Sequence, residues 1–257
     1  MQLKGKTALV TGSTSGIGLG IAIELAKQGA HIVMNGFGDV EGPKAQITAL
    51  GVRAEYHGAD MSKPAEIEAM MAFAADKFGG VDILVNNAGI QHVSPIESFP
   101  TERWDAIIAI NLSSAFHTTR LAIPYMTQKN WGRIINIASV HGLVASKDKS
   151  AYVAAKHGIV GLTKVTALEL ATTGVTANAI CPGWVLTPLV QKQVDARAQQ
   201  QGISNDEAKK QLLGEKEPSQ QFTTPEELGE LAVFFCSAAG NNVRGVAWNM
   251  DGGWAAQ

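Results

Sequence analysis

Tyr152 and Lys156 have the residue types and the spacing of an acid–base pair. We expect a helix over about 152–172, and residues four apart on a helix share one face, with Cβ atoms about 5–6 Å apart. Tyrosine, with an ordinary pKa of about 10, is a poor base at neutral pH unless a cation stabilises its phenolate. The pair could therefore remove the proton of an alcohol while a nicotinamide cofactor accepts the hydride. The alternative is a surface contact without chemical consequence.

Two more polar residues complete the candidate catalytic set. Ser139 follows an expected strand at 133–138, where its hydroxyl can hydrogen-bond a substrate oxygen. Asn111 lies in an expected long helix over about 101–128, where it can anchor a water that relays the proton. The hypothesis is that Tyr152 is the general acid/base, Lys156 lowers its pKa and holds the ribose, Ser139 orients the oxygen and Asn111 supports the relay.

A glycine-rich turn follows the first expected strand, at 7–10. Gly12, Gly16 and Gly18 form the pattern G-x-x-x-G-x-G immediately before a helix expected at about 17–28. A strand, a glycine turn and a helix in this order place backbone N–H groups and the positive end of the helix against a pyrophosphate. The sequence therefore predicts a dinucleotide site.

Strands and helices alternate along the whole chain. The expected strands lie at 7–10, 31–34, about 53–58, 81–86, 133–138, 175–180 and 245–248, and further helices at about 40–50, after 62, and at about 226–237. This alternation indicates βαβ units, a parallel sheet and right-handed crossovers. We predict an α/β fold: one doubly wound (Rossmann) domain over 1–257, with a seven-stranded parallel sheet flanked by helices.

The segment 189–221 interrupts the alternation. It is charged, rich in glutamine and weakly amphipathic, and Pro188 and Pro218 flank it. We predict a small helical lid over the carboxyl ends of the strands, where doubly wound folds bind ligands. A solvated structural excursion is the alternative.

Composition excludes several classes of function. The 257 residues carry 21 basic and 23 acidic side chains, a net charge of −2 without a basic cluster, so neither nucleic acid nor an anionic membrane is an expected partner. No apolar run reaches the length of a membrane span. Two cysteines without metal-ligand spacing predict no metal site and agree with a cytoplasmic location.

Taken together, these motifs resemble the short-chain dehydrogenase/reductase family over nearly the whole chain. The motifs that match are Thr11-Gly-x-x-x-Gly16-x-Gly18, Asp60 after the third strand, Asn86-Asn87-Ala88-Gly89, Asn111, Ser139, Tyr152-x-x-x-Lys156 and Pro182-Gly183. The resemblance implies that Asp60 and Met61 meet the adenine, that 87–89 line the cofactor trough and that 182–187 lie beside the nicotinamide. The cofactor-binding residues expected in all are Thr11, Gly12, Ser13, Ser15, Gly16, Ile17, Gly18, Gly36, Phe37, Asp60, Met61, Asn87, Ala88, Gly89, Tyr152, Lys156, Pro182, Gly183, Trp184, Val185 and Thr187.

Cofactor choice depends on the end of the second strand, where an acidic residue holds the ribose 2′-OH of NAD and a basic one pairs with the 2′-phosphate of NADP. The chain reads Asn35-Gly36-Phe37-Gly38-Asp39 there, with neither residue at the expected point. Ser15 is not basic either. We predict NAD, with Gly36 and Phe37 contacting its adenosine half.

Several donors near the catalytic set predict a substrate with a carboxylate. The substrate-binding residues expected are Gln91, Ser139, His141, Lys149, Tyr152, Trp184, Gln193 and Trp254. A lysine or a cationic histidine supplies a charge-assisted hydrogen bond to a carboxylate, and glutamine supplies a neutral one. The two tryptophans could wall a small pocket. Lys149 could equally be a solvated loop lysine.

Within the family, the segments around these residues look most like those of members that act on a short 3-hydroxy acid. The resemblance implies reversible oxidation of (R)-3-hydroxybutyrate to acetoacetate with NAD, the carboxylate being held by Gln91, His141, Lys149 and Gln193. It also implies a homotetramer built partly on the two long helices. A 3-oxoacyl-thioester reductase that uses NADPH is the nearest alternative. A nucleotide-sensing protein is another, although such relatives typically lack the tyrosine or the lysine.

Overall fold

The computed structural model describes residues 1–256, and Gln257 lies outside the described residues. Its centre is a seven-stranded sheet in the order β3-β2-β1-β4-β5-β6-β7, and every neighbouring pair is parallel. The strands are β1 (Thr7–Val10), β2 (His31–Met34), β3 (Ala54–Tyr56), β4 (Ile83–Asn86), β5 (Gly132–Ile137), β6 (Val175–Pro182) and β7 (Ala247–Met250). The structure confirms the predicted fold class.

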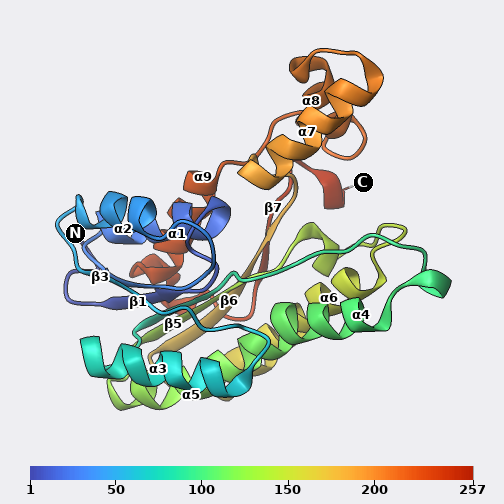
Figure 1. The fold of residues 1–257 in the computed structure, drawn as a ribbon. Helices are drawn as coiled ribbons and strands as arrows, with labels where there is room; N and C mark the ends of the chain where they lie inside the picture. Colours follow the sequence, from blue (N-terminus) through green and yellow to red (C-terminus); the bar gives the residue numbers. More distant parts are fainter. Residues whose placement is uncertain (257) are drawn as a thin grey trace.

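Helices cover both faces of this sheet (Figure 1). The helices are α1 (Gly16–Lys27), α2 (Glu41–Thr48), α3 (Pro64–Phe78), α4 (Thr101–Ile108), α5 (Ser114–Gln128), α6 (Ser150–Glu169), α7 (Pro188–Gln201), α8 (Asn205–Gly214) and α9 (Pro225–Cys236). One face carries α1, α2 and α9, and the other carries α3, α4, α5 and α6. Because both faces are covered, strands such as β1 are buried at every position, which explains their uninterrupted apolar sequences.

The strand order reverses direction between β1 and β4, since the chain adds strands outward from β1 to β3 and then returns to the other side of β1. A ligand crevice forms at such a switch point, outside the carboxyl ends of the strands. The glycine turn after β1 and the Asn86–Gly89 turn after β4 meet there, as Thr11 N donates to Val85 O at 3.0 Å. The topology therefore brings together the two turns that the sequence singles out.

The single long helix expected over 101–128 is wrong in one detail. A π-helical turn, η2 (Ala109–Ser113), separates α4 from α5. A π turn widens a helix by one residue and alters the direction of the side chains it carries. Asn111 lies at its centre.

The predicted lid consists of α7 and α8, which project beyond the carboxyl end of the sheet (Figure 1). Gly202 ends α7 in a left-handed conformation (φ +65°), as C-terminal glycines commonly do. The two helices bury a small apolar cluster of their own, built on Val194, Ala208 and Leu212. This packing gives the segment a defined shape rather than that of a solvated excursion. Among the described residues, no helix has the length and apolarity that a membrane crossing requires.

Candidate active site

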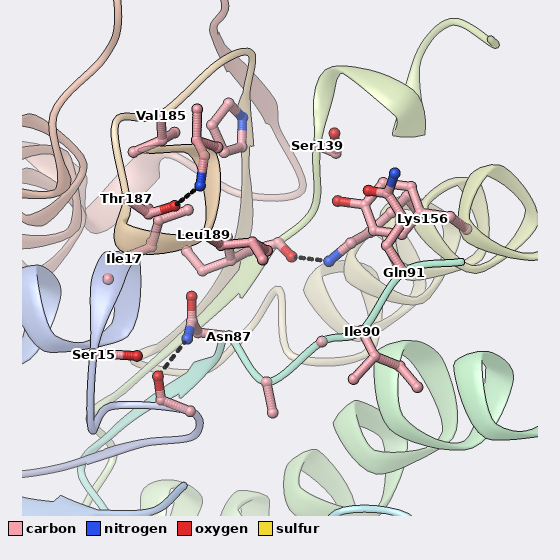
Figure 2. A pocket seen from close by; sticks show the side chains of 18 of the residues that line it. Ser15, Ile17, Asn87, Ile90, Gln91, Ser139, Lys156, Val185, Thr187 and Leu189 are labelled. Atoms are coloured by element: carbon pink, nitrogen blue, oxygen red, sulfur yellow. Dashed lines mark hydrogen bonds between the residues drawn. The ribbon is translucent and has the colours of Figure 1, made fainter. Parts of the chain in front are cut away.

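A pocket of about 520 Å³ opens at the carboxyl ends of the strands. Its size is in the usual range for a site that binds a small molecule or cofactor. Figure 2 shows Ser15 at one end of the pocket and Lys156 at the other. The residues predicted to bind the cofactor that line it are Gly12, Ser15, Gly16, Ile17, Gly36, Phe37, Asp60, Met61, Asn87, Ala88, Gly89, Tyr152, Lys156, Pro182, Gly183, Trp184, Val185 and Thr187.

The glycine turn leaves space and donors for a pyrophosphate. Gly12 and Gly16 have positive φ angles of +64° and +54°, which L side chains rarely adopt. Ser15, the N-cap residue of α1, makes no side-chain capping bond, so the first N–H groups of α1 are available to an anion. These features fit the phosphates of a dinucleotide.

Three predicted cofactor residues, Thr11, Ser13 and Gly18, lie beneath the pocket and do not line it. The Thr11 hydroxyl accepts from the backbone N–H groups of Asn87 and Ala88, both at 3.0 Å. The Asn87 side chain donates to the carbonyls of Thr11 and Gly12 at 2.9 and 3.1 Å. A Cβ at Gly18 would overlap the Gly12 carbonyl. These residues fix the two turns against each other.

The adenosine end is defined by the loop after β2. The Thr14 hydroxyl donates to Phe37 O at 2.7 Å, and the Tyr56 hydroxyl donates to Gly36 O at 2.7 Å. Phe37 stays 71% exposed at the rim, so its ring is available to a ligand. Hydrogen bonds from the backbone and side chain of Ser62 hold the pKa of Asp60 below its ordinary value. None of the described lining residues at this end is basic.

The catalytic candidates converge at the other end. The Lys156 ammonium, itself 4% exposed, donates to Ile137 O at 2.7 Å and lies 5.6 Å from the centroid of the Tyr152 ring. Burial lowers the pKa of Lys156 to about 8. Burial also raises the pKa of Tyr152, while its hydrogen bond with Ser139 acts in the opposite direction. The phenol is therefore protonated unless a nearby cation favours its ionised form.

Asn111 does not line the pocket but holds one of its walls. Its side-chain oxygen accepts from Ile90 N and its amide donates to Ile90 O, both at 2.9 Å. These two bonds fix the backbone just before Gln91. The same two bonds engage the Asn111 side-chain amide, the group that was expected from the sequence to anchor a relay water.

The predicted substrate residues all line the pocket: Gln91, Ser139, His141, Lys149, Tyr152, Trp184, Gln193 and Trp254. His141 lies at their centre, with Nδ1 3.4 Å from Ser139 Oγ, Nε2 2.9 Å from Ser146 Oγ and its ring edge-on to Trp254 at 5.3 Å. Burial, followed by the charge of Lys149, lowers the pKa of His141 to about 4. The imidazole is thus neutral at pH 7, and a cationic His141 is not available to a carboxylate. Lys149 is the positively charged candidate.

Some residues that line the pocket were not predicted from the sequence. Thr14, Ile90 and the first residues of α7, Pro188 to Val190, all border the pocket. The start of α7 carried a recognisable signal, because Thr187 is an N-cap residue, accepting from Val190 N at 3.3 Å, and proline follows it at the first helical position. Glu217, a buried carboxylate next to Trp184, had no such signal within a polar segment.

Comparison with known proteins agrees with this geometry. Residues 6–198 match the family described as short chain dehydrogenase. The chain is 73% identical, with full coverage of both chains, to a D-beta-hydroxybutyrate dehydrogenase of Cupriavidus necator. It is 56% identical over 98% of its length to an enzyme of the same name from Rhizobium meliloti, covering 99% of that protein.

Solved structures with the same architecture include reductases with bound NADPH. A variant of the actinorhodin polyketide ketoreductase with NADPH superposes with a TM-score of 0.91 at 34% identity, covering 100% of this chain and 99% of the other. L-Sorbose reductase from Gluconobacter frateurii, complexed with NADPH and L-sorbose, gives 0.94 at 31% identity, with coverage of 98% and 97%. Both of these neighbours hold the nicotinamide cofactor NADPH. The family match and the full-length identities show that this chain is an enzyme, an oxidoreductase that belongs to the short-chain dehydrogenase/reductase family.

Proposed function

We propose that the chain catalyses the reversible, NAD-dependent oxidation of (R)-3-hydroxybutyrate to acetoacetate. The observation that carries the proposal is one pocket in which Ser139, Tyr152 and Lys156 lie beside Gln91, Lys149 and Gln193. An alcohol-oxidising group and a set of carboxylate donors in one small space suit a short hydroxy acid. The relatives with 73% and 56% identity, which bear the name of such a dehydrogenase, support the same substrate.

In the proposed mechanism, bound NAD supplies the hydride acceptor. The Ser139 hydroxyl hydrogen-bonds the substrate oxygen, and the phenolate oxygen of Tyr152 takes the proton of the substrate alcohol. The Lys156 ammonium favours the phenolate by its charge. Asn111 supports the proton relay indirectly, because its side-chain amide holds the Ile90 backbone in place from the π turn.

Recognition of the carboxylate falls to Lys149, Gln91 and Gln193, with His141 as a neutral donor. Burial lowers the pKa of Lys149, so its charge is less hydrated than that of a surface lysine. A partly desolvated ammonium makes a stronger contact with a carboxylate than a solvated one. Trp184 and Trp254 wall this end and limit the length of the substrate.

NAD is the proposed cofactor, since Gly36, Phe37 and Asp60 offer no positive charge to a 2′-phosphate. This argument also disfavours a 3-oxoacyl-thioester reductase working with NADPH. A silent nucleotide sensor is disfavoured because Tyr152 and Lys156 are both present in the pocket.

One assay tests the proposal. NAD reduction is followed with (R)-3-hydroxybutyrate, (S)-3-hydroxybutyrate and a neutral secondary alcohol, each with NAD and with NADP. Turnover confined to the (R) acid, with a higher kcat/KM for NAD, is the expected result. Preference for NADP or for the neutral alcohol contradicts the proposal.

We further propose a homotetramer in the cytoplasm. The long helices expose Trp104, Phe116, Val165 and Leu168, of which Leu168 is 77% exposed. Apolar residues grouped on such helices are typical of subunit contacts. Both cysteines, Cys181 and Cys236, are free thiols, in keeping with a reducing compartment.

A further inference from the structure

Glu217 carries a carboxylate that is almost completely buried, which is unusual for an ionisable side chain. It follows α8 at the end of the lid and is 2% exposed. Its Oε1 accepts a hydrogen bond from the backbone N–H of Trp184. Its Oε2 is buried and has no hydrogen-bond partner among the described residues. A buried carboxylate without full pairing costs stability, so its presence here suggests a role other than packing.

Three segments meet at this carboxylate. The first is the end of the lid, which carries Glu217 itself. The second is the loop after β6, where Gly183 lies so close that a Cβ there would overlap Oε1. The third is the turn before the C-terminus, where a Cβ at Gly252 would stand 3.3 Å from Oε2. Glycine at both positions lets the two backbones approach the carboxylate.

The segments that meet at Glu217 carry both tryptophans of the substrate pocket. Glu217 holds the backbone of Trp184 directly. Asp251, 6% exposed, is near enough to reinforce the effect of burial in raising the pKa of Glu217. It shapes the turn that carries Trp254: Trp254 N donates to Asp251 O at 2.9 Å, and Ala255 N donates to Asp251 Oδ2 at 3.0 Å. Glu217 therefore holds the Trp184 wall directly and, at Gly252, approaches the turn that holds the Trp254 wall.

We propose that Glu217 is a positioning residue, which acts through the backbone of Trp184 to set the place of the substrate walls relative to the lid. The identity of the substrate rests on the proposed function, but the anchoring of the lid does not. Without the carboxylate, the Trp184 N–H loses its buried acceptor, and the end of the lid loses a side-chain bond to the loop after β6, which leaves the backbone bonds of Thr223 to that loop.

The charges around Glu217 agree with this assignment. Burial and the nearby Asp251 raise the pKa of Glu217 to about 7, while the bond from Trp184 opposes the shift. Burial, together with the charge of Asp251, raises the pKa of Cys181 to about 11, so this thiol stays neutral. Lys216 precedes Glu217 and reaches far enough to lower the pKa of His141. Around pH 7 the carboxylate therefore changes between a neutral and a charge-assisted acceptor.

Kinetics of three variants test the positioning role. Glu217→Ala removes the acceptor, Glu217→Gln keeps a carbonyl oxygen for Trp184 N–H, and Glu215→Gln removes an exposed lid carboxylate that pairs with Arg197 at 2.8 Å. We expect Glu217→Ala to raise the KM for (R)-3-hydroxybutyrate about tenfold, because the Trp184 N–H loses its buried acceptor, and to change the NADH dissociation constant less than about threefold. Glu217→Gln should recover most of the loss, and Glu215→Gln should match the wild type.

Limited trypsin digestion gives a second readout that needs no turnover. The lid offers cleavage sites at Lys192, Arg197, Lys209 and Lys210. Mass spectrometry should find faster cleavage at these sites in Glu217→Ala alone, at unchanged rates elsewhere in the chain. If the wild type does not oxidise the hydroxy acid, the proposed function fails while digestion still decides the anchoring. Wild-type KM and wild-type lid cleavage in Glu217→Ala, or equal losses in Glu217→Ala and Glu217→Gln, overturn the inference.

Discussion

At the scale of single residues, the proposed chemistry depends on a phenol whose surroundings disfavour its ionisation. Burial raises the pKa of Tyr152, and the compensating cation is Lys156, whose own pKa falls to about 8. The Lys156 ammonium lies 5.6 Å from the centroid of the Tyr152 ring, where its charge favours the phenolate. A tyrosine in this environment is well suited to return a proton in the reductive direction, and it needs the lysine charge to accept one.

Replacement of Tyr152 by phenylalanine removes the proton acceptor and keeps the ring. We expect kcat to fall by about 10²–10⁴-fold, the range for loss of a general acid/base. The NADH dissociation constant, measured by fluorescence titration, should stay near the wild-type value. Tyr125→Phe, on α5 and away from the pocket, is the control. Substantial turnover in Tyr152→Phe would exclude the proposed role.

Charge recognition separates Lys149 from His141. Because the pKa of His141 is about 4, its imidazole is neutral throughout the working range. Lys149→Ala should raise the KM for the hydroxy acid by about 10–100-fold, the loss expected for a charge-assisted hydrogen bond, with little effect on the KM for NAD. His141→Gln, which keeps a neutral donor, should have the smaller effect. Equal effects of Lys149→Ala on both KM values would mean a structural role for the lysine.

The pKa of Glu217 predicts a pH-dependent stability. Its folded value of about 7 lies above its ordinary 4.5, so the folded chain holds a proton that the unfolded chain has released between these values. The resulting stabilisation is complete below about pH 4.5 and is lost as the pH rises through about 7. Glutamine does not titrate, so the Tm of Glu217→Gln minus that of the wild type should become more positive between about pH 5 and about pH 8. A difference that stays constant over this pH range would contradict the buried ionisation.

At the scale of elements, the parts that the sequence predicts are those with a local signal. Central strands such as β1 and β4 are short, mostly apolar runs because both sheet faces are covered, and the glycine turn follows β1 as the pattern requires. The π turn at Asn111 is different, since it places the amide against the Ile90 backbone, a contact between distant segments. Glu217 was missed for the same reason, because its polar sequence neighbours give no hint of the loop and turn that bury it.

The turn at the start of α1 allows an element-scale test. A Cβ at Gly18 would overlap Gly12 O and approach the Asn87 side-chain amide. The hydrogen bond between these two groups joins the turns after β1 and β4. Gly18→Ala should therefore weaken NADH binding by about tenfold or more, since overpacking of this kind costs about 1–3 kcal/mol. Gly161→Ala on α6, where a Cβ meets open space, is the matched control. Unchanged NADH affinity in Gly18→Ala would show that the turn can adjust.

At the scale of the whole molecule, a net charge of −2 offers no field that attracts an anion. Selection of the proposed carboxylate substrate would then depend on donors inside the pocket. The three candidate donors come from elements spread along the chain: Gln91 after β4, Lys149 before α6, and Gln193 on α7. The sheet and the lid together set the positions of these three side chains relative to one another. Sequence patterns identified the donors individually, whereas the structure brings them into one space.

The long helices carry the last test, which concerns assembly. Leu168 and Val165 on α6 are 77% and 52% exposed, and burying such side chains between subunits removes apolar surface from water at about 25 cal/mol per Å². Light scattering after size exclusion should give a four-chain species for the wild type. Leu168→Glu places a charge in the proposed contact and should shift the protein towards smaller species, because an unpaired charge in an apolar interface is strongly unfavourable. Ile96→Glu, at an equally exposed apolar site outside the long helices, should leave the assembly intact. A wild-type monomer, or a Leu168→Glu variant that remains tetrameric, would place the subunit contact elsewhere on the molecule.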